Sequence, residues 1–119
     1  MKQLNKTDLS SFMERFSNLT NGEIVSLEFL TPTSFKIVLT VQDKNRGFDW
    51  VNLNFEFTGI LDAKLLDDAA LKAVDMENGV SISFTQEGVE VGFGSGEYLS
   101  SPLRIYTEVL KYEETSFAL

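Results

Sequence analysis

A run of oxygen-bearing side chains near the middle of the chain has the spacing of a calcium-binding loop. Asp43, Asn45 and Asp49 lie close together with Gly47 between them, and Ca²⁺ prefers such oxygen ligands. An EF-hand loop also needs glycine at its sixth position, which is Phe48 here, and glutamate at its twelfth, which this run lacks. The flanking segments alternate like strands, not helices. We therefore interpret the run as a polar hairpin loop and predict neither a metal site nor a cofactor.

A second group of acids could support acid–base chemistry if burial raised one pKa. These acids are Asp62, Asp67, Asp68, Asp75 and Glu77. The surrounding sequence gives no sign of an apolar pocket. A helix cap with a solvated face is therefore the simpler interpretation, and an acidic patch for a basic protein surface is the alternative.

The residue types that the chain lacks restrict catalysis further. It has no His and no Cys, which excludes a Ser-His-Asp or Cys-His nucleophile. A Ser-Lys pair, a carboxylate dyad or an all-oxygen metal site would still be chemically possible. No such constellation stands out, so we predict that the protein is not an enzyme.

The net charge of −8 is unevenly distributed along the 119 residues. Residues 1–48 contain five acids and six bases, whereas residues 49–119 contain thirteen acids and four bases. Such a chain repels phosphate backbones and anionic membranes, and it attracts basic partners. We predict binding to neither nucleic acid nor membrane. The alternative is that the acidity only keeps the protein in solution.

The lengths of the apolar stretches indicate where in the cell the protein is expected. No apolar run of signal-peptide length follows Met1, and no stretch approaches the ~20 residues that a membrane-spanning helix needs. The absence of Cys fits a reducing compartment. We expect a soluble, cytoplasmic protein.

Hydrophobic periodicity predicts the elements that position these side chains. Residues 7–20 repeat apolar side chains at helical spacing and end at Asn21-Gly22, which predicts an N-terminal helix. Alternation with a period of two predicts half-buried strands, and the clearest hairpin turns at Glu87-Gly88. The strands cover about residues 25–29, 35–41, 51–57, 80–84, 89–93 and 103–112.

Three segments are less regular. Residues 60–66 could continue a strand or begin a helix, residues 67–75 resemble a capped short helix, and residues 115–119 resemble a loose tail. Because each strand has one apolar and one polar face, we predict a single α+β domain over residues 1–119. Its N-terminal helix would pack on a single, largely antiparallel sheet of about six strands.

Trp50 is out of phase with the apolar residues of its predicted strand. Val51 and the residues at every second position after it would point inward, so Trp50 would share the polar face with Asn52, Asn54 and Glu56. An exposed Trp beside adaptable polar groups is typical of a binding anchor. The alternative is that Trp50 precedes the regular strand and folds under the loop.

The last predicted strand also carries aromatic residues. Leu103, Ile105 and Val109 would form its apolar face, with Tyr106 and Tyr112 on the other. The two tyrosines could join the binding surface or pack beneath a second helix.

Two segments together carry a family resemblance. Residues 48–62 read FDWVNLNFEFTGILD, with a Phe-x-Gly-aliphatic ending, and a Gly-Val-Ser-Ile-Ser-Phe segment opens the later hairpin. Over residues 48–93 this pattern is similar to small bacterial immunity proteins of toxin–antitoxin and contact-dependent inhibition systems, and to related uncharacterised bacterial families. The resemblance implies a protein that binds a cognate toxin domain, often a basic nuclease, and blocks its active site. It carries over no catalytic residue.

These observations predict a non-catalytic protein-binding module, specifically an immunity protein that neutralises a basic toxin domain. The alternative is a small-ligand-binding or structural protein of a larger assembly. An open sheet leaves two edges for pairing, so the oligomeric state stays open. The predicted partner-binding residues are Trp50, Asn52, Asn54, Glu56, Asp62, Asp67 and Asp68.

Overall fold

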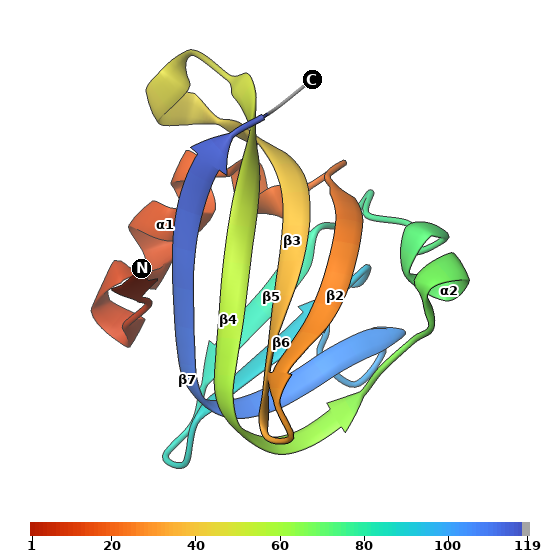
Figure 1. Cartoon of the computed structure of the whole chain (residues 1–119). Coiled ribbons are helices and arrows are strands. Elements are labelled where there is room, and N and C mark those ends of the chain that lie inside the picture. The colour runs from red at the N-terminus through yellow and green to blue at the C-terminus, as the bar shows by residue number, and fades with distance from the viewer. Residues whose placement is uncertain (118–119) are drawn as a thin grey trace.

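The computed structural model describes residues 1–117, which form one antiparallel sheet with short helices around it. The strand order is β2-β3-β4-β7-β6-β5, and the two-residue β1 also pairs with β7 (Figure 1). The predicted α+β class and antiparallel sheet are confirmed, while β1 is a strand that the sequence did not predict. The elements are β1 (Lys2–Gln3), α1 (Leu9–Arg15), β2 (Glu23–Thr31), β3 (Ser34–Asp43), β4 (Asp49–Lys64), α2 (Asp68–Lys72), β5 (Val80–Phe84), β6 (Val89–Phe93) and β7 (Leu103–Ser116).

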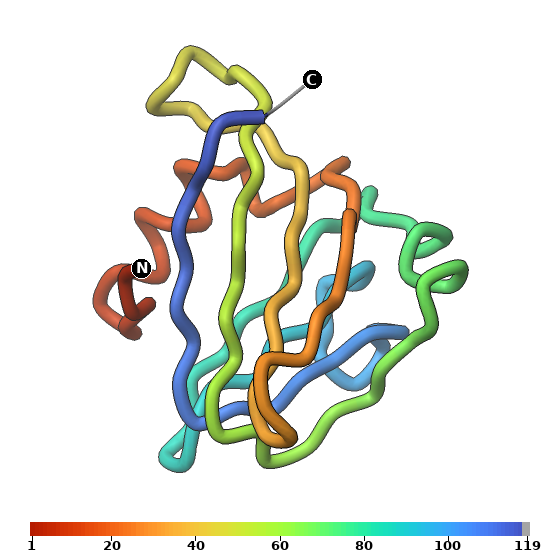
Figure 2. The backbone as a smooth tube through the Cα atoms, viewed as in Figure 1, coloured from red at the N-terminus to blue at the C-terminus, as the bar shows by residue number. Residues whose placement is uncertain are grey.

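The sheet folds back on itself because its two longest strands bend. The first part of β4, through Thr58, pairs with the second half of β7, whereas residues 60–64 pair with the first half of β7. That first half of β7 also pairs with β6. The tube in Figure 2 shows β5 and β6 crossing behind β2, β3 and β4. The strands therefore form two layers of one continuous sheet.

The hydrophobic core lies between these layers. Phe55 and Phe57 of β4 are fully buried, as their alternation predicts. The Phe55 ring centroid lies 6.3 Å from that of Phe93 on β6, which joins the layers directly. Fully buried side chains from several elements surround them, including Leu4, Phe16, Leu19, Phe35, Ile37, Leu39, Leu53, Leu103 and Ile105.

The N-terminal helix is shorter than the predicted 7–20. α1 covers Leu9–Arg15, with single 3₁₀ turns at Lys6–Asp8 and Ser17–Leu19 on either side. The three residues of the second turn have φ between 52° and 58°, which is left-handed backbone. A right-handed helix cannot continue through such residues. Among residues 1–117, no helix is long and apolar enough to cross a bilayer.

Aromatic contacts connect α1 to the first layer of the sheet. The Phe12 ring centroid lies 4.7 Å from Tyr112 of β7, edge to face, and 6.0 Å from Phe55 of β4. Such pairs contribute beyond the apolar area that they bury. Phe12 thus anchors α1 beside β7, where Figure 1 shows it.

The ambiguous segment after residue 59 is resolved as strand. β4 runs through Lys64, so most of residues 60–66 continue it, and α2 then covers part of the predicted 67–75 helix. The β5–β6 hairpin is confirmed, and its turn is closed by a 2.8 Å bond from the Thr85 N–H to the Gly88 carbonyl.

The phase of β7 differs from the prediction. Ile105 and Thr107 are buried, yet the next buried residue is Leu110, three positions further on. The buried row therefore changes phase within β7 between Thr107 and Leu110, although the pairing with β4 stays in step from Thr58–Val109 to Ile60–Thr107. Val109 therefore faces outward, half-buried, opposite Thr58, and is not the predicted core residue.

The same phase change separates the two tyrosines that the sequence placed on one face. Tyr112 is buried under α1, whereas Tyr106 is half-buried and paired with Asp62. The expected loose tail is also partly wrong, because Thr115 and Ser116 belong to β7. The last two positions of that tail, 118 and 119, lie outside the described residues.

Thr107 stabilises the bend of β7. Its buried hydroxyl lies 2.8 Å from the Thr58 carbonyl and 3.2 Å from the Val109 carbonyl, so it can donate to either. We expect Thr107→Val, which keeps the shape but removes this donor, to lower the free energy of unfolding by about 1–2 kcal/mol. Urea denaturation followed by circular dichroism measures the change. Thr58→Val, at an exposed position, is the control, and an equal loss in both variants would contradict this role.

Candidate functional site

The outer face of the first layer carries four of the predicted partner-binding residues. Trp50, Asn52, Asn54 and Glu56 occupy alternate positions of β4, opposite to its buried row. Trp50 is 45% exposed, so it does not fold under the loop. Figure 1 shows no helix over this face among the described residues. We call this face the outer β4 surface, with its neighbours on β3 and β7.

Cross-strand hydrogen bonds hold the polar side chains of the outer β4 surface. The Thr40 hydroxyl donates to the side-chain Oδ1 of Asn52 at 3.3 Å. The Asn54 amide lies 3.4 Å from the Glu113 carbonyl and 3.3 Å from the Thr115 hydroxyl. These long bonds fix side-chain directions on strands whose backbone is already paired on both sides. The surface is therefore a preformed polar platform.

Charges of both signs lie further along the same face. Glu56 is directly opposite Lys36 on β3 and Lys111 on β7. Lys36 also forms an ion pair of 3.7 Å with Glu28 on β2. Opposite charges on neighbouring strands stabilise the sheet modestly. They also leave this end of the surface close to neutral, so it is not an acidic patch.

Phe117, which the sequence did not predict as a site residue, extends the surface beside Trp50. Both side chains are 45% exposed, and both line a hollow of about 280 Å³. Phe117 lay in the segment expected to be a loose tail. A usable signal did exist, because Phe117 is two residues beyond Thr115 and the alternation of β7 places both on the outward face.

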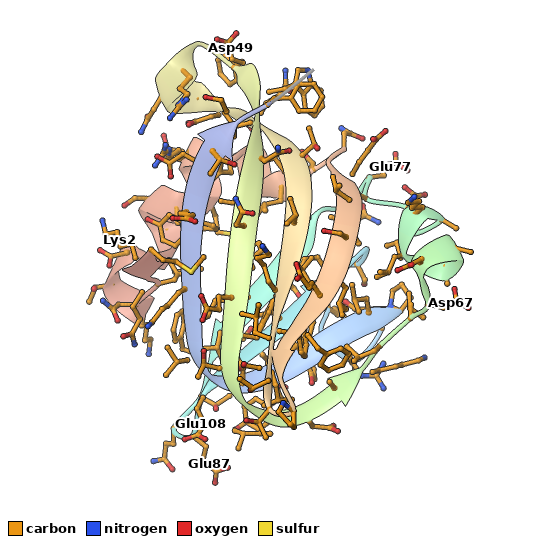
Figure 3. All side chains as sticks on the ribbon, viewed as in Figure 1. Lys2, Asp49, Asp67, Glu77, Glu87 and Glu108 are labelled. Atoms are coloured by element: carbon orange, nitrogen blue, oxygen red, sulfur yellow. The ribbon has the colours of Figure 1, made fainter. Side chains whose placement is uncertain are left out.

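The three predicted aspartates lie elsewhere. Asp62 follows the bend of β4, and Asp67 caps α2 by accepting a 2.8 Å bond from the Ala70 N–H. Asp68 is in the first turn of α2. In Figure 3, Asp67 is on the flank at α2, whereas Asp49, the neighbour of Trp50, is at the end of the molecule. The structure thus does not bring the aspartates beside Trp50.

The acids of the second half of the chain are dispersed in general. Figure 3 shows Asp67 and Glu77 on one flank, and Glu87 and Glu108 at the end opposite Asp49. Their effect on a partner is therefore the long-range field of the net charge.

Asp62 belongs to a separate polar cluster near the 94–102 loop. Burial raises the pKa of Tyr98, and the negative charges of Asp62 and Glu90 raise it further. Arg104 partly opposes this shift. A phenol with a raised pKa stays protonated at neutral pH, so Tyr98 can donate a hydrogen bond but does not serve as a base.

The calcium-like run proves to be a structural ion cluster. Asp43 is fully buried and accepts two bonds from Arg15 of α1, at 2.9 and 2.8 Å, and a third from the Asn45 N–H at 3.0 Å. Arg15 also contacts Glu114 of β7 at 3.0 Å. The Asp43 oxygens therefore connect helix, loop and sheet. Within residues 1–117, no group of three or more metal-ligating side chains is found.

The charges of this cluster stabilise one another. The bonds from Arg15 hold the pKa of Asp43 below its usual value despite burial, and the bond from the Asn45 N–H lowers it further. Burial acts to raise the pKa of Glu114, but the bond from Arg15, a backbone N–H bond and the positive charges of Arg15 and Arg46 together outweigh it, so that pKa is also lowered. The bonds to Asp43 raise the pKa of Arg15. Both carboxylates stay ionised at neutral pH.

Trp50 on β4 and Phe117, directly after the end of β7, are two exposed aromatic residues that line one hollow of the outer β4 surface. Comparison with known proteins adds no further guide. No protein-family model, no curated protein and no solved structure matches the chain.

Proposed function

We propose that this protein is a non-catalytic protein-binding module whose contact surface is the outer β4 surface. The exposure of Trp50 on a paired central strand supports this proposal most directly. Large aromatic side chains on a rigid scaffold lose little conformational entropy on binding, and they often dominate the binding free energy. Asn52 and Asn54 beside it supply hydrogen-bonding groups that can orient a partner.

The partner that we propose is a basic toxin domain, which the protein would neutralise in the cytoplasm as an immunity protein. The net charge of −8 favours a basic partner. The resemblance of residues 48–93 to immunity proteins points in the same direction. Asp62, Asp67 and Asp68 would contribute through the field that speeds encounter, because Asp62 lies beyond the bend of β4 and the other two lie at the start of α2.

We expect a toxin domain to be encoded next to this gene, and the first test uses that domain. Mixed at low salt, the two proteins are expected to form a complex that calorimetry detects and that abolishes toxin activity. Absence of any complex would contradict the proposed function.

Salt provides an independent prediction about the encounter. Raising the ionic strength tenfold is expected to slow association about tenfold or more while changing dissociation little, because screening weakens steering between opposite net charges. Stopped-flow mixing measures both rates. A salt-independent association rate would remove the electrostatic part of the proposal.

Trp50→Ala tests the position of the surface. We expect the dissociation constant for the toxin domain to rise about 30-fold, which corresponds to the ~2 kcal/mol typical of an anchor residue. Leu99→Ala is the matched control, because Leu99 is the most exposed of the large apolar side chains at 79% and lies on the 94–102 loop. Equal effects of the two substitutions would place the contact surface elsewhere.

A further inference from the structure

The hollow beside Trp50 has a defined floor and walls. Glu23 on β2 pairs with Thr40 on β3, and Trp50 pairs with Gln42, two residues from Thr40 on the same face. Thr40 is only 9% exposed, so it forms the floor. The walls are Glu23 with Asn21 on one side and the two aromatic residues on the other. Its volume is about 280 Å³.

The walls combine two features that attract a positive charge. The faces of Trp and Phe rings carry negative electrostatic potential, and Trp binds cations best. Glu23 adds a carboxylate, and Asn21 adds an amide oxygen. A planar guanidinium suits this combination because it can stack on an indole ring while donating to a carboxylate.

The protein's own cations leave this site open. Arg46 lines the neighbouring hollow on another side of Trp50, but its Nε is directed to Asp43 at 3.6 Å. The cation–π contact found within the described chain is Arg15 over Phe16, away from this site. Glu23 forms no ion pair with any residue that the structure describes. A carboxylate and two aromatic side chains that line the hollow are thus available to an external cation.

We propose that this hollow, the Trp50–Phe117 pocket, binds the guanidinium group of an arginine side chain on a protein partner. The aromatic rings sandwich or flank the guanidinium plane, and Glu23 accepts its hydrogen bonds. The inference deepens the proposed function and rests on it only for the identity of the protein that carries the arginine. The pocket would thus give this acidic protein one specific contact with its partner, in addition to the long-range field of its net charge.

Because Trp50 is the only tryptophan, the pocket has its own spectroscopic reporter. The experiment titrates the ¹⁵N-labelled protein with the capped peptide acetyl-Gly-Ser-Arg-Ser-Gly-amide and follows the Trp50 indole N–H and the Asn21 and Thr40 amides by NMR. We expect saturable shifts at these signals, with a dissociation constant on the order of 1 mM for so small a ligand. The same peptide with citrulline, which keeps the shape but lacks the charge, is expected to produce no saturable shift.

Two matched variants separate the pocket from general charge attraction. Glu23→Gln is expected to weaken binding of the arginine peptide about threefold to fivefold, and Phe117→Ala by a similar factor. Glu28→Gln removes the same charge from the same strand but does not line the pocket, and it is expected to leave the dissociation constant unchanged. Saturation by the citrulline peptide, or equal effects of E23Q and E28Q, would overturn the proposal.

The toxin experiments and the arginine-peptide titration test separate claims. If the adjacent toxin domain does not bind while the arginine peptide saturates the pocket, the proposed toxin partner is wrong and the pocket stands. If the toxin binds but the arginine peptide produces no saturable shifts, the immunity function stands and the pocket is wrong.

Discussion

Gly79→Ala is expected to lower the free energy of unfolding by about 2–5 kcal/mol, a large part of the stability of a domain this small. Gly79 has φ of +69°, and a Cβ atom added there would lie 2.1 Å from the Asn18 carbonyl oxygen and 3.1 Å from the Thr20 nitrogen. Left-handed backbone costs an alanine about 1–2 kcal/mol. Overpacking against backbone that is itself held in place adds about 1–3 kcal/mol.

The position is sensitive because three connections meet there. The Gly79 N–H donates to the Met76 carbonyl at 2.9 Å, and the Gly94 N–H donates to the Gly79 carbonyl at 2.9 Å. The Asn21 N–H donates to the same Met76 carbonyl at 2.7 Å. The turns before β2, before β5 and after β6 are thus held against one another. A shift that relieved the clash at Asn18 would have to break some of these bonds.

Substitutions at two other glycines separate the contribution of left-handed backbone from that of overpacking. Gly47 has φ of +64° and nothing within 4 Å of an added Cβ, so Gly47→Ala should lose only the backbone term of about 1–2 kcal/mol. Gly96 also has open space and lacks a positive φ, so Gly96→Ala should change stability by no more than about 0.5 kcal/mol. Urea denaturation at neutral pH measures all three. If Gly79→Ala lowers the free energy of unfolding by no more than Gly47→Ala does, the predicted clash between the added Cβ and Asn18 is wrong.

The period-two alternation of apolar residues predicted the strands well because each strand buries mainly one of its two faces. In β3, the first part of β4 and the β5–β6 hairpin, apolar residues alternate with mostly polar ones, and the apolar rows are largely buried. Residues 60–64 were ambiguous because they lie beyond the bend of β4. What makes them strand is their pairing with the first half of β7, which is a long-range contact.

Two features of the fold that differ from the prediction, the phase of β7 and the end of α1, have a similar origin. The buried row of β7 changes phase between Thr107 and Leu110, where the strand passes from one layer to the other, and no residue type marks this position in the sequence. The early end of α1 depends on left-handed backbone at Ser17, Asn18 and Leu19, of which only asparagine favours that conformation. In both places tertiary packing outweighs local preference.

The candidate site was predictable in part. The outward position of Trp50 followed from its phase, and so did its polar neighbours on β4. Phe117 was not predicted because residues 115–119 resemble a loose tail in sequence, whereas β7 extends to Ser116. The aspartates at positions 67 and 68 were grouped with Trp50 by charge alone, and charge does not say where a helix will lie.

Asp43→Asn is the second substitution with a large expected effect. It should lower the free energy of unfolding by about 3 kcal/mol at pH 7. Removing one partner of a buried ion pair usually costs about 3–5 kcal/mol, since the other charge is left uncompensated. Arg15 keeps its contact with Glu114 at 3.0 Å, which places the loss at the lower end. Asparagine retains the size and can still accept from the Asn45 N–H, so the charge itself is tested.

Glu14→Gln is the matched control for that loss. Glu14 pairs with Lys44 at 2.9 Å and so also connects α1 to the loop after β3, but both side chains are exposed. Solvent and salt screen such a pair, and little change is expected. A similar loss in both variants would mean that burial of Asp43 does not matter.

The pH dependence of the Asp43→Asn effect follows from the lowered pKa of Asp43. Between that folded-state pKa and the unfolded value of about 3.9, the unfolded chain binds a proton at this carboxyl that the native protein does not. The stabilisation is therefore complete above about pH 4 and is lost as the pH falls through the folded-state pKa. Asp43→Asn lacks this carboxyl. The difference in unfolding free energy between wild type and variant should thus shrink from pH 7 to pH 3 in urea titrations, and an undiminished difference at pH 3 would show that the charge of Asp43 is not the source of the stability.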